Sequence, residues 1–92
     1  MSMTMVCKRA LVDGKVQGVW FRGSTREQAL ALDITGYAKN LPDGRVEVIM
    51  CGREGDIETL SVWLKKGPPL AIVKSLDIAT VELQQFPGFD VC

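Results

Sequence analysis

The sequence has no histidine among its 92 residues, and this absence removes much of the usual catalytic chemistry near neutral pH. Nucleophiles activated by histidine and metal centres built on histidine are both excluded. Cysteine is scarce as well: Cys7, Cys51 and Cys92 have no Cys-x-x-Cys spacing, so there is no metal-binding or thioredoxin-type motif. We therefore expect no metal and no cofactor, and any catalysis must rely on carboxylates, Lys, Arg, amides or the main chain.

Neither sign of charge is in excess, because 11 Lys and Arg balance 11 Asp and Glu. Without surplus positive charge, binding to nucleic acid by counterion release is not expected. No apolar run approaches the ~18 residues that span a bilayer. Residues 1–6 also lack the apolar core of a signal peptide before Lys8 and Arg9 interrupt them. We expect a cytoplasmic monomer, a single domain over residues 1–92, with no nucleic-acid or membrane partner.

The hydrophobic residues follow periods that alternate between strand and helix. Period-two patterns predict strands at 6–12, 35–41, 46–51 and 72–83, with a short final one at 86–91. Helical spacing predicts helices at 24–33 and 54–65, the second ended by Lys65-Lys66-Gly67-Pro68. This order predicts an α+β, ferredoxin-like split β-α-β fold, with an antiparallel sheet and both helices on one face. An RNA-recognition module shares the topology, but it needs aromatic residues on the central strands, and residues 8–11 and 46–49 have none.

The segment 13–22 joins the first predicted strand to the first predicted helix. A helix N-terminus has unpaired N–H groups and a dipole that favours anions. Gly14 and Gly18 would let the main chain curl so that successive amides point at one centre. Arg22 adds a guanidinium that matches two phosphate oxygens, and Lys15 adds positive potential. Each residue alone has an ordinary structural explanation, but together they predict a phosphate site. The motif of nucleotide-binding P-loops is absent.

Two stretches resemble the signatures of the acylphosphatase family. The first resembles that family's first signature and reads Val12-x-Gly14-x-Val16-Gln17-Gly18-Val19-x-Phe21-Arg22. The second resembles its second signature and reads Gly36-Tyr37-Ala38-Lys39-Asn40-x-x-x-Gly44-x-Val46, followed by Gly52. The resemblance covers about residues 5–92. Acylphosphatases are small ferredoxin-like enzymes that hydrolyse acyl phosphates to a carboxylate and inorganic phosphate.

The resemblance implies roles for particular residues. Arg22 would bind the phosphate of an acyl phosphate and Asn40 would position the attacking water. Inorganic phosphate would be both product and inhibitor. The phosphate would be cradled by the loop that comprises Lys15, Val16, Gln17, Gly18, Val19, Trp20, Phe21 and Arg22. An asparagine beside Pro-Asp-Gly is otherwise typical of a turn.

The chemistry fits a chain without histidine. The carboxylate leaving group has a conjugate-acid pKa near ~4, so it departs without a general acid. Phosphoryl transfer depends mainly on positioning and charge stabilisation. A non-catalytic phosphate-binding regulatory module of the same fold remains an alternative. A third candidate is an acylphosphatase-like domain of a larger carbamoyl-transfer protein, which is disfavoured because the sequence ends after one domain.

A disulfide between Cys7 and Cys51 is a further expectation. The first and third strands of the predicted fold are antiparallel neighbours. Matching their inward faces pairs Val12 with Val46, and the same register places Cys7 opposite Cys51 on the outer face. Directly opposed residues have Cα atoms about 4.5–5.5 Å apart, within the range of a disulfide. A register shifted by two residues would separate the sulfurs, and a reducing cytosol would leave two thiols. Cys92 is left unpaired.

Overall fold

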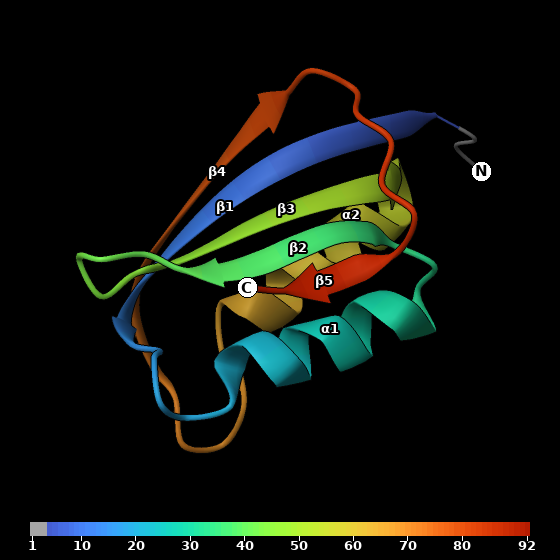
Figure 1. Cartoon of the computed structure of the whole chain (residues 1–92). Helices are drawn as coiled ribbons and strands as arrows, with labels where there is room; N and C mark the ends of the chain where they lie inside the picture. The colour runs from blue at the N-terminus through green and yellow to red at the C-terminus, as the bar shows by residue number, and fades with distance from the viewer. Residues whose placement is uncertain (1–3) are drawn as a thin grey trace.

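Strands and helices alternate along residues 4–92, the part of the chain that this computed structural model describes (Figure 1). The elements are β1 (Met5–Lys15), α1 (Phe21–Ala31), β2 (Thr35–Asn40), β3 (Val46–Arg53), α2 (Glu54–Leu64), β4 (Ile72–Val81) and β5 (Phe89–Val91). Residues 1–3, part of the segment expected to contain no signal peptide, lie outside the described residues. Within residues 4–92, neither helix is long and apolar enough to cross a bilayer.

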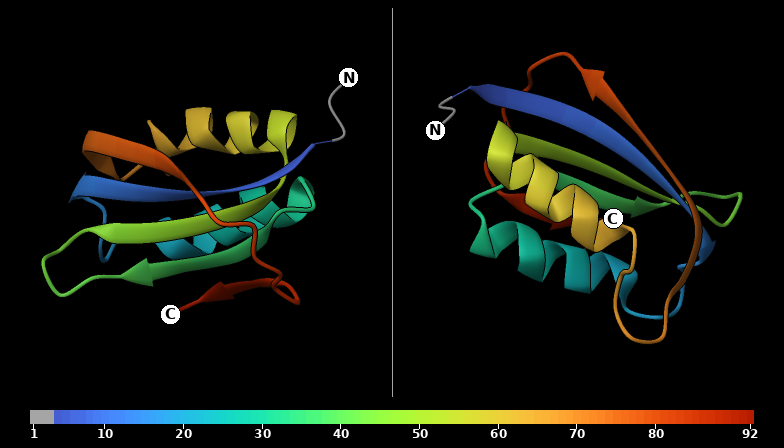
Figure 2. Two further views of the ribbon diagram at one scale, coloured as in Figure 1. Left: turned by 90° about the horizontal axis from the view of Figure 1, so that it is seen from above. Right: turned by 180° about the vertical axis from the view of Figure 1, so that it is seen from behind.

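The strands form one sheet in the order β4-β1-β3-β2-β5, and both helices pack on one face of it (Figure 2). The predicted ferredoxin-like α+β fold is therefore confirmed, with β1 beside β3 in the interior of the sheet. The sheet is not antiparallel throughout. After β4, residues 82–88 cross the sheet to its opposite edge, so that β5 runs parallel to β2, with Gly36 opposite Phe89.

Helix α1 begins at Phe21, three residues before the predicted start at Ser24. The buried stripe explains the difference, because Phe21, Thr25 and Ala29 share the face that packs on the sheet. The buried Thr25 hydroxyl donates to the Phe21 carbonyl oxygen at 2.8 Å, so the stripe contains no unpaired polar group at this position. The core lies between this face, the matching face of α2 and the inward side of β1 and β3.

The connection between β4 and β5, which we call the strap (residues 82–88), crosses the outer face of the sheet near one end (Figure 1). Phe86 of the strap packs edge-on against Tyr37, with ring centroids 6.0 Å apart. It also contacts a small buried cluster formed by Cys7, Ile49 and Cys51. Sequence periodicity predicted a strand at 86–91 but gave no sign that the preceding residues cross this face.

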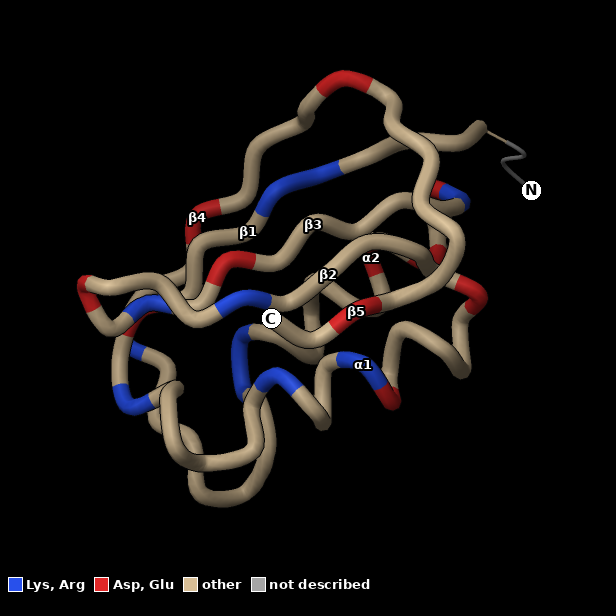
Figure 3. The backbone as a smooth tube through the Cα atoms, viewed as in Figure 1, with Lys and Arg blue, Asp and Glu red and all other residues tan. Residues whose placement is uncertain are grey.

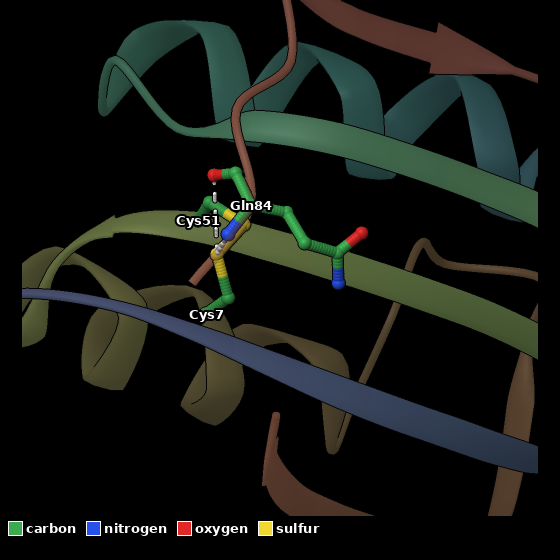
Figure 4. The surroundings of a disulfide bond; sticks show 3 residues. All are labelled: Cys7, Cys51 and Gln84. Atoms are coloured by element: carbon green, nitrogen blue, oxygen red, sulfur yellow. Dashed lines mark hydrogen bonds between the residues drawn. A yellow bond between two sulfur atoms is a disulfide. The ribbon is translucent and has the colours of Figure 1, made fainter. Parts of the chain in front are cut away.

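The predicted register of β1 and β3 is confirmed, with Cys7 opposite Cys51 and their Cα atoms 4.1 Å apart. Their sulfur atoms are joined in a disulfide beneath the strap (Figure 4). The Gln84 main-chain N–H donates to Cys7 Sγ at 3.2 Å. The Gln84 carbonyl oxygen lies 3.6 Å from the same sulfur, where it could accept a hydrogen bond from a reduced thiol. The cysteine pair thus connects the two central strands and also contacts the strap.

A polar network occupies the same outer face. Glu47 accepts hydrogen bonds from Arg9 at 2.7 Å and from the Tyr37 hydroxyl at 2.8 Å. Burial alone would raise the pKa of Glu47, but the hydrogen bonds from Arg9 and Tyr37 outweigh it and hold that pKa below its usual value. Burial, followed by the hydrogen bond to Glu47, raises the pKa of Tyr37 to about 12. The network therefore favours an ionised carboxylate beside a protonated phenol.

We predict that the disulfide forms in purified, air-exposed protein. Alkylation of the unreduced, denatured chain should then add one group, at Cys92, when the protein is weighed by mass spectrometry. Three adducts would contradict the prediction. The pairing closes a separation of 44 residues, for which the chain-entropy model gives roughly 4 kcal/mol as an upper estimate of stabilisation. Reduction should therefore lower the free energy of unfolding by at most that amount.

Alkaline unfolding should depend on Tyr37. Its raised pKa means that the folded protein holds the phenol proton more tightly than the unfolded chain does. The resulting stability is complete below pH 10 and is lost as the pH rises toward about 12. Tyr37→Phe should show a smaller fall in the free energy of unfolding across this window than the wild type, measured by urea denaturation. Parallel curves for the two proteins would show that the phenol does not contribute.

Candidate active site

The loop of residues 16–20 between β1 and α1 is fixed at both ends. Val16 and Phe21 are each 1% exposed, so a buried side chain anchors the main chain at each end of the loop. Between them, Gln17 Nε2 donates to the carbonyl oxygens of Leu41 and Arg45 at 2.9 and 3.0 Å. These two bonds hold the loop against the turn between β2 and β3. The loop therefore has a defined position although most of it is at the surface.

The backbone of this loop alternates in handedness. Gly18 has φ 76° and Trp20 has φ 63°, whereas Val19 between them is not left-handed. Such an alternation turns successive N–H groups toward a common concavity that binds anions. Within residues 4–92, no main-chain N–H from Gln17 to Gly23 donates to another group of the chain; the first bond of α1 runs from Ser24 N–H to the Trp20 carbonyl oxygen. These donors lie at the N-terminal, positive end of the α1 dipole.

Gly14 was predicted to shape this curl together with Gly18, and for Gly14 the prediction is wrong. Gly14 lies within β1, at the bulge where the pairing with β4 shifts register, and has φ 132°. A Cβ at this position would collide with the Ile72 carbonyl oxygen of the neighbouring strand. Glycine is therefore required at position 14 for the close approach of β4, while Gly18 is the glycine that shapes the loop.

Arg22 and Asn40 meet at one oxygen atom. Arg22 Nη1 donates to the main-chain oxygen of Cys92 at 2.6 Å, and the Asn40 main-chain N–H donates to the same oxygen at 3.4 Å. The end of β2 thus lies beside the start of α1, as the parallel direction of β1 and β2 predicted. Asn40 Oδ1 is buried and has no hydrogen-bond partner within the described residues. A buried acceptor of this kind normally has a partner, often water.

A model of the family described as acylphosphatase matches residues 8–91. The chain belongs to the acylphosphatase family. The acylphosphatase of Hahella chejuensis is 53% identical over 85 residues, which cover 91% of this chain and 90% of that protein. The structure of an acylphosphatase from Coxiella burnetii superposes with a TM-score of 0.92 at 40% identity, covering 96% of this chain and 93% of that one. HypF from T. kodakarensis also matches, with a TM-score of 0.81 at 33% identity over 97% of this chain but only 12% of HypF.

The acylphosphatase loop borders a cavity of about 430 Å³. Its lining comprises Val16, Gly18, Val19, Trp20, Phe21, Arg22, Gly23, Leu70 and Val91. Three other residues predicted to belong to the site do not line this cavity: Lys15, Gln17 and Asn40. Lys15 is exposed at the end of β1, Gln17 points to the β2–β3 turn, and Asn40 is linked to the site through Cys92.

Some parts of the site were not found from the sequence. Gln17 was expected to contribute to phosphate binding; its side chain instead fastens the loop to the turn, and its main-chain N–H is the group that, among the described residues, stays free for an anion. Cys92 was considered only as an unpaired thiol, and no local pattern indicated that its main-chain oxygen would lie between Arg22 and Asn40. Gly67 has φ 70° and lies against the Phe21 ring. The only sequence feature that pointed to Gly67 was its position in the Lys-Lys-Gly-Pro segment that ends α2, and that feature did not indicate the contact with Phe21.

The site carries positive charge at one side chain and does not belong to an extended basic surface. Lys and Arg are interspersed with Asp and Glu along the chain (Figure 3). Arg22 is the one charged residue among those that line the cavity. Residues 4–92 contain no group of three His, Cys, Asp or Glu side chains that could hold a metal ion. The arrangement therefore offers one guanidinium and a set of main-chain donors to a small anion.

Arg22→Gln should weaken the binding of inorganic phosphate at least tenfold, because the variant loses the guanidinium beside the main-chain donors. Bound phosphate raises the melting temperature of the protein that binds it, so the shift in Tm against phosphate concentration measures the affinity. The matched control is Arg26→Gln, one turn further along α1, where Arg26 Nε donates to the Phe89 carbonyl oxygen at 3.1 Å. Equal phosphate affinities in the two variants would contradict the assignment of Arg22.

Proposed function

We propose that the protein is an acylphosphatase, which hydrolyses the carboxyl–phosphate bond of an acyl phosphate to a carboxylate and inorganic phosphate. The observation that carries this proposal is the meeting of Arg22 and Asn40 at one oxygen, beside the main-chain donors that open α1. Membership of the acylphosphatase family supports the same reaction. The phosphate is held by the loop from Lys15 to Arg22, with its side-chain contact made by Arg22.

The transferred phosphoryl group carries its charge on three oxygens in a loose transition state. Main-chain N–H groups between Gln17 and Gly23 can donate to these oxygens without moving, since they make no competing bond within the described residues. A guanidinium has five N–H donors. The contact with Cys92 uses one of them, so Arg22 retains donors for two phosphate oxygens. Preorganised donors of this kind account for much of the rate acceleration in charge-developing reactions.

Asn40 orients the attacking water in this proposal. Its buried Oδ1 needs a hydrogen-bond donor, and water on the far side of the phosphorus from the leaving carboxylate would supply one. The P–O bond to the acyl group breaks as the water oxygen bonds to phosphorus, and a phosphate oxygen accepts the released proton. The carboxylate leaves without protonation because its conjugate acid has a pKa near ~4. Neither histidine nor a metal ion is required.

We further propose that residues 1–92 form a single domain, that the protein is monomeric and that it is cytoplasmic. The seven elements within residues 4–92 contribute to one sheet and its helical cover, which supports the single domain. Small acyl phosphates and inorganic phosphate are the proposed partners. The balanced charge of the chain favours neither nucleic acid nor an anionic membrane surface.

The direct test is hydrolysis of benzoyl phosphate, followed by the loss of its ultraviolet absorbance, with and without EDTA. The wild type should turn over at the same rate in both conditions. A rate abolished by EDTA would overturn the metal-free mechanism, and phosphate binding without turnover would favour the regulatory module.

Asn40→Ala should lower kcat about 100-fold, because it removes the group that orients water. The inhibition constant for inorganic phosphate should stay nearly unchanged, since Asn40 contacts water and not the phosphate. Lys39→Ala is the matched control on the preceding, exposed residue of β2 and should keep the wild-type kcat. A large rise in the phosphate inhibition constant with unchanged kcat would assign Asn40 to phosphate binding instead.

A further inference from the structure

Two large apolar side chains beside the candidate site are left in solvent. Trp20 is 73% exposed and Leu70 is 72% exposed, the highest values among the exposed large hydrophobic residues of the described chain. Val91 is 44% exposed, and all three line the same cavity next to Arg22. Single exposed apolar residues are common on protein surfaces, but several that line one cavity beside a candidate site are typical of ligand binding. We call these three residues the apolar shelf.

The position of the Trp20 ring is determined by the local backbone. A bulky residue rarely adopts a left-handed conformation, yet Trp20 has φ 63°. Its six-membered ring lies over Gly23, where an added Cβ would collide with Cε2 and Cζ2 of the indole. Alanine is the better helix former and would be favoured at position 23 by propensity alone. Glycine there leaves room for the ring, so the indole packs against the first turn of α1.

The shelf adjoins the proposed phosphate cradle. The main chain of Trp20 belongs to the run of free N–H donors, and its side chain extends from that run into the cavity lining. A group attached to a phosphate held by these donors therefore emerges next to the indole face. The cavity of about 430 Å³ is large enough for a ring-sized substituent, and small-molecule sites generally start near ~300 Å³.

Resting on the proposed function, we propose that the apolar shelf binds the acyl group and selects acyl phosphates whose acyl part is aromatic or bulky and apolar. A conjugated aryl carboxyl group is flat and would stack on the indole face. An acetyl group would leave most of the shelf exposed. Arg22 is the one charged residue lining the cavity, so an acyl group with a second anionic charge would find no further cation there.

The test compares kcat/KM for benzoyl phosphate with kcat/KM for acetyl phosphate. Trp20→Asn removes the indole while keeping a residue type that tolerates the left-handed backbone. The benzoyl-to-acetyl ratio should fall roughly tenfold in this variant, mainly through a higher KM for benzoyl phosphate. Trp20→Phe should recover most of the ratio. Leu70→Ala should lower it about threefold.

Gly23→Ala provides a second, independent variant. It retains Trp20 and all main-chain donors but takes the space that the indole ring occupies. The added methyl group should displace the ring, so the ratio should fall in this variant as well. Leu83→Ala is the matched control for Leu70, because Leu83 is 65% exposed and lies on the strap, away from this cavity. Its ratio should equal that of the wild type.

The outcomes separate this inference from the proposed function. If the wild type hydrolyses both substrates and the ratio is unchanged in Trp20→Asn and Gly23→Ala, the shelf does not bind the acyl group, while the acylphosphatase assignment stands. If both rates fall equally in these variants, Trp20 only shapes the phosphate loop, and the inference is again overturned. If the wild type hydrolyses neither substrate, the proposed function and the inference fall together.

Discussion

The register between β1 and β3 is the constraint on which the rest of the structure depends. At one end of the pair, Cys7 lies opposite Cys51, and the disulfide gives the strap a buried cluster to pack on. At the other end, Val12 lies opposite Val46, which places the exit of β1 beside the turn that follows β2. A slip of one residue would turn the core-facing side chains of one strand to the outer face of the sheet. It would also move the loop of residues 16–20 away from the carbonyl groups that Gln17 binds.

The candidate site is assembled from segments that are distant in sequence, and each is secured by a different contact. The loop is fastened to the β2–β3 turn by Gln17, and Arg22 and Asn40 are joined through Cys92. The free N–H groups of the loop are tolerable because the loop is at the surface, where water or an anion can pair with them. The site therefore breaks local rules, in a left-handed tryptophan and an unpaired buried Asn40 oxygen, only where a ligand can compensate.

Much of this fold could be predicted because its elements have strong periodicity. Alternation in β1 and β3 indicated the observed register but left a shift of two residues open, and the ending of α2 at Lys65-Lys66-Gly67-Pro68 was correctly indicated. The strap and the parallel pairing of β5 were missed, because a segment that crosses a sheet has no period of its own. Gly14 was misassigned because a left-handed glycine looks the same in a sequence whether it serves a turn or a bulge. The contact of Arg22 with Cys92 is purely tertiary and left no local signal.

The chemistry of the site follows from what it cannot supply. A chain with no histidine lacks the side chain that most readily donates a proton near neutral pH. An alkoxide would therefore have to depart without protonation, which makes it a poor leaving group. A carboxylate needs no such proton. The cavity also has few polar side chains, because the residues that line it besides Arg22 are glycines and apolar residues. Under the proposed function, the main chain and one guanidinium recognise the phosphate, so discrimination among substrates comes from the shape and polarity of the acyl group. The apolar shelf beside the loop is the surface proposed to provide it.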